Sequence, residues 1–457
     1  MVQIISIDTP TLGDRSYVAH DGHVAIVIDP QRDIDRVLAV ARHQGVTITH
    51  IFETHIHNDY VTGGLALAEA TDAAYHVNAA DSVAYDRVPV HDGDVIDVSP
   101  DLSVRAIATP GHTYTHLSYA LSSRGEQVGV FTGGSLLFGS TGRPDLLGPD
   151  HTSTLAHHQY HSAHRLADEL PDSVQVLPTH GFGSFCSATQ SEATASTIGQ
   201  EKWSNPALTQ AEEQWVSELL AGLDAFPTYY AQMAPLNNAG PDAPDLTAPA
   251  PADKEAIRAS LEAGEWVVDL RTRTAFADGF VPGTFNIGID SQFATYIGWM
   301  MPWGAKLTLL GESAEQVAEA QRELVRIGID RLEGAATGGP QDWSDRPLET
   351  LQRATFADLV QVRHHRPVTV LDVRRRLEWE ESHIDGAVFI PIHEIAQRVG
   401  ELPEGEVWVH CAAGYRASVA ASVIAAAGHP TVYIEDDFAR AGEVGLPLVP
   451  AEPTPAG

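Results

Sequence analysis

The chain has very few cysteines, only Cys186 and Cys411 among 457 residues. Two cysteines do not form a disulfide framework, so we expect a cytoplasmic protein in which one of them has a thiol role. Long apolar runs are also missing. None approaches the roughly 18 residues of a membrane-spanning helix, so we expect no membrane partner. The first residues lack the basic start and the apolar core of a signal peptide.

Basic residues are scarce as well, with 28 Lys and Arg against 61 Asp and Glu, which gives a formal net charge of −33. Such a chain is repelled by nucleic-acid backbones and by anionic membranes, and we therefore expect neither as a partner. A homo-oligomer stays open. The length of the chain predicts two to four domains.

Changes in the sequence pattern divide the chain into four parts. Residues 1–200 alternate short strands and helices. Residues 201–252 predict a helix and then a linker rich in Pro and Gly, which we expect to begin at Asn237. Residues 253–350 (the first repeat) and 351–457 (the second repeat) resemble two copies of one unit. Each copy has a strand that ends in Asp-x-Arg, then a helix and a glycine turn.

The densest group of candidate ligands is His55-Ile-His57-Asn-Asp59. It follows an apolar run, Thr47–Phe52, that predicts a buried strand. Side chains two residues apart in an extended chain point the same way, so these three groups are predicted to share one side. Imidazole nitrogens and carboxylate oxygens are typical ligands of zinc and iron. The pattern therefore predicts a metal site.

Two later histidines also follow predicted strands. His112 comes after a Thr-Pro-Gly turn, and His180 comes after the strand predicted at residues 174–177. Ligand loops gather where several strands end at one edge of a sheet. Both histidines therefore lie at predicted strand ends, where a ligand loop is expected.

The second repeat carries a loop around Cys411, with the sequence His410-Cys-Ala-Ala-Gly414-Tyr-Arg416. A strand runs into this loop, and an alanine-rich helix follows it. N–H groups of the loop and of the helix start favour a thiolate or an anionic persulfide at Cys411. Gly414 permits the tight curl and Arg416 adds positive charge, so both are candidates for substrate binding. The first repeat has no cysteine near Gly311, and we expect it to be a structural or docking domain.

These motifs carry a resemblance to a known family. The first pattern resembles the signature of the metallo-β-lactamase fold, His-x-His-x-Asp-His, with Tyr60 in the last place. With the Cys411 loop, the chain is similar to persulfide dioxygenases fused to rhodanese domains. The resemblance implies the α/β class: a metallo-β-lactamase αββα sandwich followed by two rhodanese-like α/β domains with central parallel sheets.

The resemblance also implies a ligand set. His55 and His112 match the firm ligands of the family, whose third iron ligand is an aspartate at the place of Gly134. Candidates for the third position are Asp59, Asp145, His57, His180 and water. We expect one Fe(II) per chain, with Zn(II) as the alternative and no metal if Gly134 disables the site. Without the bridging aspartate and the histidine after Asp59, a two-metal site is not expected.

The function implied by the resemblance is persulfide metabolism. Iron and O2 would oxidise a low-molecular-weight persulfide, such as glutathione persulfide, to sulfite. Arg143 is a candidate contact for a glutathione carboxylate. Cys411 would transfer sulfane sulfur from a persulfide or from thiosulfate. One alternative is a sulfurtransferase whose metallo-β-lactamase-like domain has no catalytic role. Another is a thioester hydrolase that resembles glyoxalase II.

Overall fold

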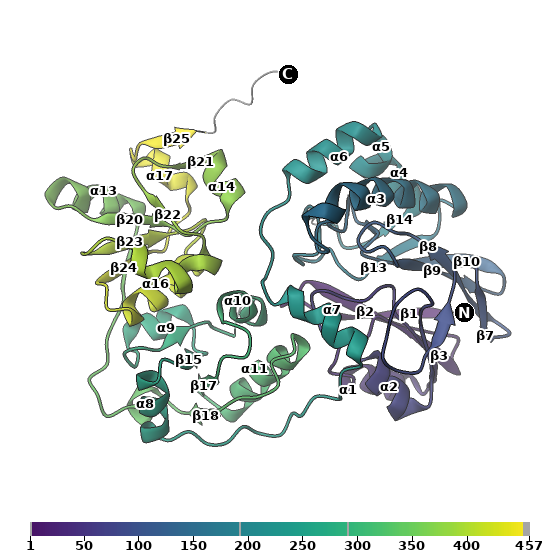
Figure 1. Cartoon of the computed structure of the whole chain (residues 1–457), viewed down its shortest axis with the longest axis horizontal. Coiled ribbons are helices and arrows are strands. Elements are labelled where there is room, and N and C mark those ends of the chain that lie inside the picture. Colours follow the sequence, from purple (N-terminus) through teal and green to yellow (C-terminus); the bar gives the residue numbers. More distant parts are fainter. Residues whose placement is uncertain (1, 192, 290–291, 451–457) are drawn as a thin grey trace. The chain divides into compact units, whose positions relative to one another are not determined.

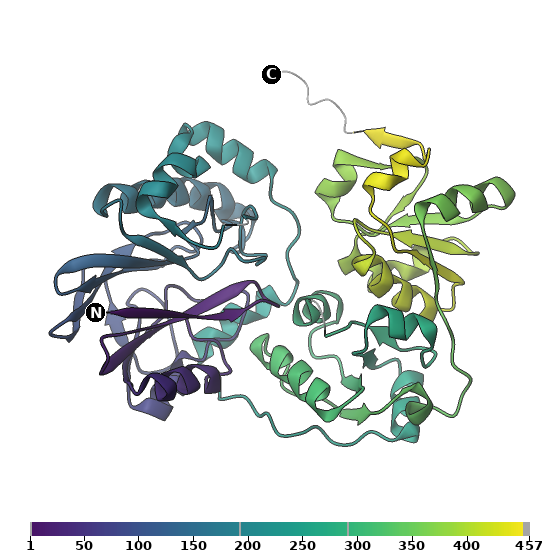
Figure 2. The same cartoon turned by 180° about the vertical axis from the view of Figure 1, so that it is seen from behind.

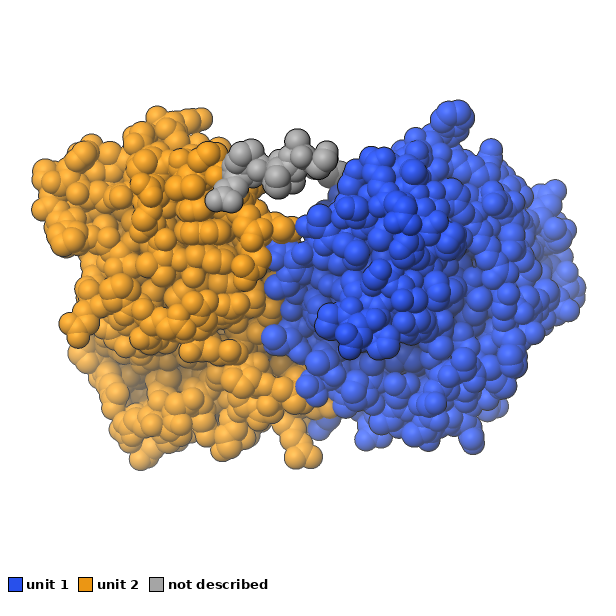
Figure 3. Space-filling model, turned by 45° about the horizontal axis from the view of Figure 1, so that its top comes forward, with its two compact units in different colours: residues 1–245, 324–328 blue, residues 246–323, 329–457 orange. Residues whose placement is uncertain are grey.

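A computed structural model describes residues 2–191, 193–289 and 292–450 of the chain (Figure 1). The chain divides into two compact units (Figure 3). Unit 1 consists of residues 1–245 and 324–328, and unit 2 consists of residues 246–323 and 329–457.

Unit 1 contains two six-stranded sheets. Their strand orders are β1-β2-β3-β4-β5-β6 and β14-β13-β10-β9-β8-β7. The strands of the first sheet are β1 (Gln3–Thr9), β2 (Asp14–His20), β3 (Val24–Ile28), β4 (Thr47–Phe52), β5 (Ala74–Asn78) and β6 (Val88–Val90). Those of the second are β7 (Val95–Ser99), β8 (Leu102–Ala108), β9 (Leu117–Ser123), β10 (Glu126–Gly133), β13 (Gln175–Pro178) and β14 (Ser196–Thr197). A separate small hairpin joins β11 (Leu136–Leu137) and β12 (Ser140–Thr141).

The two sheets pack face to face, and helices cover their outer faces (Figures 1 and 2). Phe52, Tyr119 and Phe131 lie in the core between the sheets. The helices α1 (Asp35–Gln44) and α2 (Gly64–Thr71) pack on the first sheet, and α3 (Pro149–Glu169) packs on the second. The predicted αββα sandwich is confirmed, because each sheet buries one apolar face against the other and one against helices.

The candidate ligands lie where strands of both sheets end. Strand β4 has the predicted bounds and runs parallel to β3 and β5. His55 follows β4 and His112 follows β8. His180 follows β13, which runs parallel to β10. Parallel strands bring their carboxyl ends to one edge of a sheet, so residues far apart in sequence meet there.

The part of unit 1 after residue 197 contains more helix than we predicted. Its helices are α4 (Ile198–Ser204), α5 (Pro206–Thr209), α6 (Glu212–Ala221) and α7 (Tyr230–Ala239). Asn237, where we placed the start of a linker, is a buried residue of α7. This part of the linker prediction is wrong, because Pro235 inside the helix and the following Gly240 hid the helical segment in the sequence. Residues 241–250 contain neither helix nor strand.

Unit 2 contains two parallel sheets, one in each repeat. Their orders are β16-β15-β17-β18 and β19-β24-β23-β20-β22. The strands are β15 (Trp266–Asp269), β16 (Phe285–Asn286), β17 (Leu307–Gly311), β18 (Gly334–Thr337), β19 (Gln352–Ala354), β20 (Thr369–Asp372), β22 (Val388–Phe389), β23 (Val407–His410) and β24 (Thr431–Ile434). A further antiparallel pair joins β21 (Ser382–Ile384) and β25 (Leu448–Pro450). The prediction of central parallel sheets is confirmed.

Helices cover these sheets. In the first repeat they are α8 (Lys254–Glu262), α9 (Arg273–Asp278), α10 (Phe293–Met300), α11 (Ala314–Arg326) and α12 (Pro340–Trp343). In the second they are α13 (Phe356–His365), α14 (Arg376–Glu381), η1 (Ile392–Glu394), α15 (Ile395–Arg398), η2 (Val399–Glu401), α16 (Tyr415–Ala426) and α17 (Ala439–Glu443).

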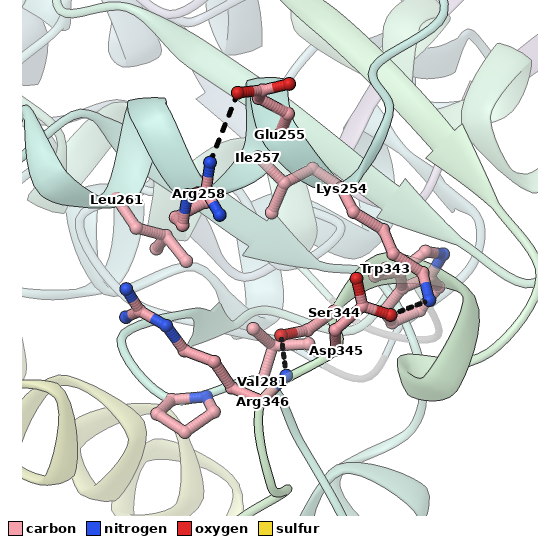
Figure 4. Close-up of a pocket in the computed structure, with 11 residues that line it drawn as sticks. Lys254, Glu255, Ile257, Arg258, Leu261, Val281, Trp343, Ser344, Asp345 and Arg346 are labelled. Carbon is pink, nitrogen blue, oxygen red and sulfur yellow. Dashed lines mark hydrogen bonds and ion pairs between the residues drawn. The ribbon is translucent and has the colours of Figure 1, made fainter.

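A pocket of about 340 Å³ lies beside α8 in the first repeat (Figure 4). Its cationic side chains are paired with carboxylates, as Lys254 is with Asp345 at 2.6 Å. Its lining contains no histidine and no cysteine. Because metal binding and sulfur transfer need those side chains, we assign neither chemistry to this pocket.

Candidate metal centre and cysteine loop

Three histidines converge at the strand ends of unit 1. His55, His112 and His180 each offer a ring nitrogen, and the three nitrogens lie within 4.8 Å of one another. All three side chains are buried. The Nε2 atoms of His55 and His180 are 3.4 Å apart. About the same distance separates two ligand nitrogens on one tetrahedral ion with bonds of about 2.05 Å.

The second ring nitrogen of each histidine, Nδ1, has a hydrogen-bond partner. Thr54 Oγ1 donates to Asp29 Oδ2, so it can accept the proton of the imidazole next to it. The three Nδ1 atoms thus have acceptors: Thr54 Oγ1 at 2.9 Å for His55, the Arg143 carbonyl oxygen at 2.8 Å for His112, and Asp14 Oδ1 at 2.9 Å for His180. Outer partners of this kind fix the tautomer and turn Nε2 toward a metal.

The protonation of these rings also fits a metal. Burial and the neighbouring His57 push the pKa of His55 well below its usual value. Burial and His180 lower the pKa of His112 to about 3, and no described residue pairs with its Nε2. Burial would lower the pKa of His180 too, but the charges of Asp59 and Asp14 raise it to about 10. In the metal-free protein a proton on His180 can therefore lie between the facing Nε2 atoms, and a metal ion would displace it.

Gly134, the position at which the resemblance implies an aspartate, has no room for a side chain. A Cβ atom there would lie 2.3 Å from His112 Cδ2 and 2.6 Å from His112 Cγ. The Gly134 N–H donates to His116 Nε2 at 3.0 Å. The Nε2 atom of His116 is therefore paired with a backbone N–H group, and His116 is not one of the three converging histidines. The His112 ring thus occupies the space that a side chain at position 134 would need.

Gly134→Asp is expected to harm the site and not to repair it. The added Cβ must displace the His112 ring, so we expect at least about a tenfold loss of metal affinity and a loss of about 1–3 kcal/mol in unfolding free energy. Metal titration and chemical denaturation measure the two effects. Gly134→Ala is the matched control, since it adds the same Cβ without a carboxylate. Tighter metal binding by the aspartate variant than by the wild type would contradict the three-histidine site.

His57 lies beside His55, with the ring centroids 4.1 Å apart, but its Nε2 has other partners. It is 3.0 Å from the Tyr60 hydroxyl and 3.3 Å from both Asp29 Oδ1 and Glu53 Oε2. Burial lowers the pKa of His57, but the two carboxylates raise it to about 9. A protonated His57 thus offsets part of the negative charge of a buried acidic pair. His57 also lies in a group with Asp59 and His180 whose ligand atoms are within 4.8 Å of one another, so its role as a metal ligand stays a prediction.

This buried ion group predicts a pH dependence of stability. The folded-state pKa of His57, about 9, is higher than the value near 6.5 of an unfolded histidine. Its stabilisation is complete below pH 6.5 and is lost as the pH rises through 9. We expect the unfolding free energy of the metal-free protein to fall by about 1–3 kcal/mol across this window. Denaturation series at several pH values measure it, and His57→Gln should flatten the slope. A stability that rises with pH would contradict this assignment.

The two carboxylate candidates for the third ligand have different surroundings. Asp59 Oδ2 is 3.2 Å from Nδ1 of His180, on the side away from His55. Asp145 binds the Arg143 guanidinium through two contacts of 2.7 Å. The structure brings His180 together with His55 and His112 in one group of ligand atoms, and with His57 and Asp59 in another. The assignment of individual ligands remains a prediction.

Arg143 is buried and fully engaged. Besides Asp145, its guanidinium donates to the carbonyl oxygens of Phe185 and Asp224 at 3.2 and 2.6 Å. These contacts hold the Arg143 carbonyl against His112 Nδ1. A direct contact with a glutathione carboxylate stays a prediction, and the structure gives Arg143 a role in positioning His112.

Several residues of the site were not found from the sequence. Asp14 supports His180 from 166 positions away, and Asp29 binds the Thr54 hydroxyl. Asn237 of α7 accepts from the Thr62 N–H and donates to the carbonyl oxygens of His57 and Tyr60, all at 2.9 Å. No local signal marks these residues, because each acts through a contact that only folding creates.

The Cys411 loop in unit 2 has the predicted order of strand, loop and helix. It joins β23 to α16, and the Gly414 N–H donates to Cys411 Sγ at 3.1 Å. Gly414 has φ 93°, a left-handed conformation that favours glycine. Cys411 is 2% exposed. Arg416 does not point freely at the sulfur, because it forms contacts of 2.5 and 2.7 Å with Glu378. Burial raises the pKa of Glu378, but Arg416 brings it down to about 2, so the pair stays ionised.

Comparisons with known proteins agree with this reading. Residues 355–437 match the family described as rhodanese-like domain. The chain is 28% identical over 209 residues to the mitochondrial persulfide dioxygenase ETHE1 of Homo sapiens, covering 46% of this chain and 74% of that one. It is 33% identical over 161 residues to the hydroxyacylglutathione hydrolase of Polaromonas sp. (strain JS666), covering 35% of this chain and 57% of the hydrolase.

A solved structure resembles a larger part of the chain. The crystal structure of a metallo-β-lactamase from Staphylococcus aureus is 28% identical, with a TM-score of 0.65, and covers 74% of this chain and 98% of that one. Among the described residues, no helix has the length and apolar character to cross a membrane. The chain therefore combines a metallo-β-lactamase fold, similar in sequence to persulfide dioxygenases, with a rhodanese-like domain.

Proposed function

We propose that the chain oxidises a low-molecular-weight persulfide to sulfite at an iron centre in unit 1 and transfers sulfane sulfur through Cys411 in unit 2. The observation that carries the first activity is the convergence of one ring nitrogen from each of His55, His112 and His180. The similarity to a persulfide dioxygenase supports the choice of substrate, and iron is a metal that oxygenases use with ligands of this kind. When bound, iron would supply the activation of O2 and an open position for a sulfur ligand.

The ligand set suits an anionic substrate. Three neutral imidazoles bring no negative charge, so a divalent ion keeps both of its positive charges for incoming ligands. A persulfide ionises to an anion and would neutralise part of this charge. The overall reaction balances as RSSH + O2 + H2O giving RSH and sulfurous acid, which ionises to sulfite. Asp14, Thr54 and the Arg143 carbonyl would hold the three rings in place throughout.

The second activity is assigned to the Cys411 thiolate. It would attack the outer sulfur of thiosulfate, form an S–S bond at Cys411 and release sulfite with the electron pair of the broken bond. A persulfide donor would release its thiol in the same way. The Gly414 N–H, 3.1 Å from Sγ, stabilises the anionic sulfur before and after transfer. One chain then carries two steps that share sulfur intermediates.

Oxygen uptake by anaerobically iron-loaded protein tests the proposal. On addition of glutathione persulfide we expect iron-dependent uptake of one O2 per sulfite formed. Zinc-loaded protein is the matched control and should show none. Absence of uptake by protein that retains its iron after desalting would overturn the dioxygenase. Hydrolysis of S-lactoylglutathione by the zinc form would indicate the hydrolase instead.

A second candidate is sulfur transfer alone, and Gly134 is the observation that favours it. With no carboxylate at that position, the site differs from that of the family whose chemistry we infer. In that case the iron would wash out on desalting while thiosulfate:cyanide transfer persists. A two-metal hydrolase is less favoured, because Tyr60 stands where such enzymes have a histidine and its hydroxyl lies 3.0 Å from His57.

A further inference from the structure

The first repeat has no cysteine, yet one of its helices packs beside the Cys411 loop. All eight residues of α10 are buried. The Tyr296 ring meets the Tyr415 ring edge-on, with centroids 5.3 Å apart. Tyr415 begins α16 directly after the loop. Trp299, one turn further along α10, stacks on His393 of the second repeat at 4.8 Å. Helix α10 therefore contacts the second repeat at the cysteine site.

Two polar contacts fix the repeats to each other in this region. The Asn286 N–H of β16 donates to Ser422 Oγ of α16 at 2.9 Å. Arg273 of the first repeat forms an ion pair with Glu435 at 2.9 Å. Glu435 lies against the loop, since a Cβ atom on Gly414 would be 3.2 Å from its Cα. The surroundings of the loop are therefore built from both repeats.

The Tyr296 hydroxyl stands among the charged groups of this site. The side chain is 7% exposed. Burial raises its pKa to about 12, Arg416 opposes that rise, and Cys411 adds to it. The phenol is therefore protonated at neutral pH. No described residue forms a hydrogen bond with the Tyr296 hydroxyl. Its proton remains available to a ligand, whereas Arg416 is already occupied by Glu378.

We propose that Tyr296 is a substrate-binding residue of the Cys411 site, contributed by the repeat that has no cysteine. Its hydroxyl donates a hydrogen bond to the anionic sulfur group at the loop, either the sulfonate of thiosulfate or the outer sulfur of the Cys411 persulfide. The inference rests on the proposed sulfur transfer. It gives the first repeat a part in recognising the substrate, beyond support of the fold.

Tyr296→Phe in the full chain tests this assignment. A hydrogen bond to a charged group contributes about 1.5–3 kcal/mol, so kcat/KM for thiosulfate should fall about 10- to 100-fold. The matched control is Tyr433→Phe. Tyr433 is a buried tyrosine of the same unit, and the charges acting on it do not include Cys411. That variant should keep kcat/KM within about twofold of the wild type.

A second readout needs no sulfur transfer. Cys411 is alkylated with anionic iodoacetate and, separately, with neutral iodoacetamide. The rate with iodoacetate divided by the rate with iodoacetamide is compared among variants, and Cys411→Ser serves as the blank. Loss of an anion-binding hydroxyl should lower the ratio about tenfold in Tyr296→Phe and leave it unchanged in Tyr433→Phe. An unchanged ratio, or an equal fall for both reagents, would overturn the inference. If the wild type transfers no sulfur, the proposed function fails, but the ratio still decides the role of Tyr296.

Discussion

His180→Ala is expected to lower the affinity for Fe(II) by more than about 100-fold, since even the outer partners of metal ligands account for about 10- to 100-fold. The variant removes one of three converging nitrogens, and Gly134 offers no side chain to replace it. Oxygen uptake with glutathione persulfide should be lost with the metal. Metal content after desalting and a competition titration against a chelator measure the affinity independently of activity.

Two matched variants separate coordination from general damage to a buried cluster. His116→Gln should keep its metal, because Nε2 of His116 accepts the Gly134 N–H and an amide oxygen can accept it too. Asp14→Asn should bind the metal about 10- to 100-fold more weakly, because the amide forms a weaker hydrogen bond with His180 Nδ1 than the carboxylate does. Wild-type affinity in His180→Ala, together with a loss in Asp59→Asn, would identify Asp59 as the third ligand and refute the three-histidine site.

Cys411→Ser is expected to reduce thiosulfate:cyanide sulfur transfer by more than about 1000-fold, the scale of effects on removal of a catalytic nucleophile. A serine hydroxyl fits the space of the buried thiol but does not carry sulfane sulfur, so the fold should be kept while the chemistry stops. Persulfide oxidation supplied with free substrate should stay within about twofold, because the proposed metal ligands all belong to unit 1.

The control for this prediction is the other cysteine. Cys186 is fully buried in unit 1, where burial and the charge of Asp59 raise the pKa of its thiol well above the usual value. A thiol held protonated is a poor nucleophile, so Cys186→Ser should leave sulfur transfer unchanged. Transfer that survives Cys411→Ser but is lost in Cys186→Ser would reverse the assignment of the two cysteines.

Local patterns accounted for most of the fold. The apolar run Thr47–Phe52 became β4 with the same bounds, because β-branched residues bounded by polar ones favour a strand in almost any surroundings. The repeated Asp-x-Arg strand ends became two parallel sheets. In both repeats the arginine pairs with the aspartate two residues before it, at 2.6 Å for Arg271 and 2.7 Å for Arg374. The interaction joins residues only two positions apart, so it is visible as a pattern in the sequence.

Helix α7 was missed because tertiary contacts override its local signals. Pro235 weakens a helix in isolation, and the hydrophobic pattern of the segment is poor. What stabilises the segment is burial of Tyr230, Met233 and Asn237, the last of which binds the backbone around His57. Local sequence patterns do not predict side-chain hydrogen bonds between positions about 180 residues apart.

The sequence by itself determined which chemistries are available: histidines after three strands, a cysteine loop in one repeat and no cysteine in the other. Only the tertiary structure decided how these groups combine. His180 reaches His55 across 125 positions because Asp29 binds both Thr54 and Thr179, the residues just before them, and the two Nε2 atoms lie 3.4 Å apart. His57, two residues from His55, faces Asp29 and Glu53 instead. The spacing of residues within one helix or strand predicts which side chains share a face. The direction of a histidine ring nitrogen depends instead on the hydrogen-bond partner of the other ring nitrogen, which only the folded chain supplies.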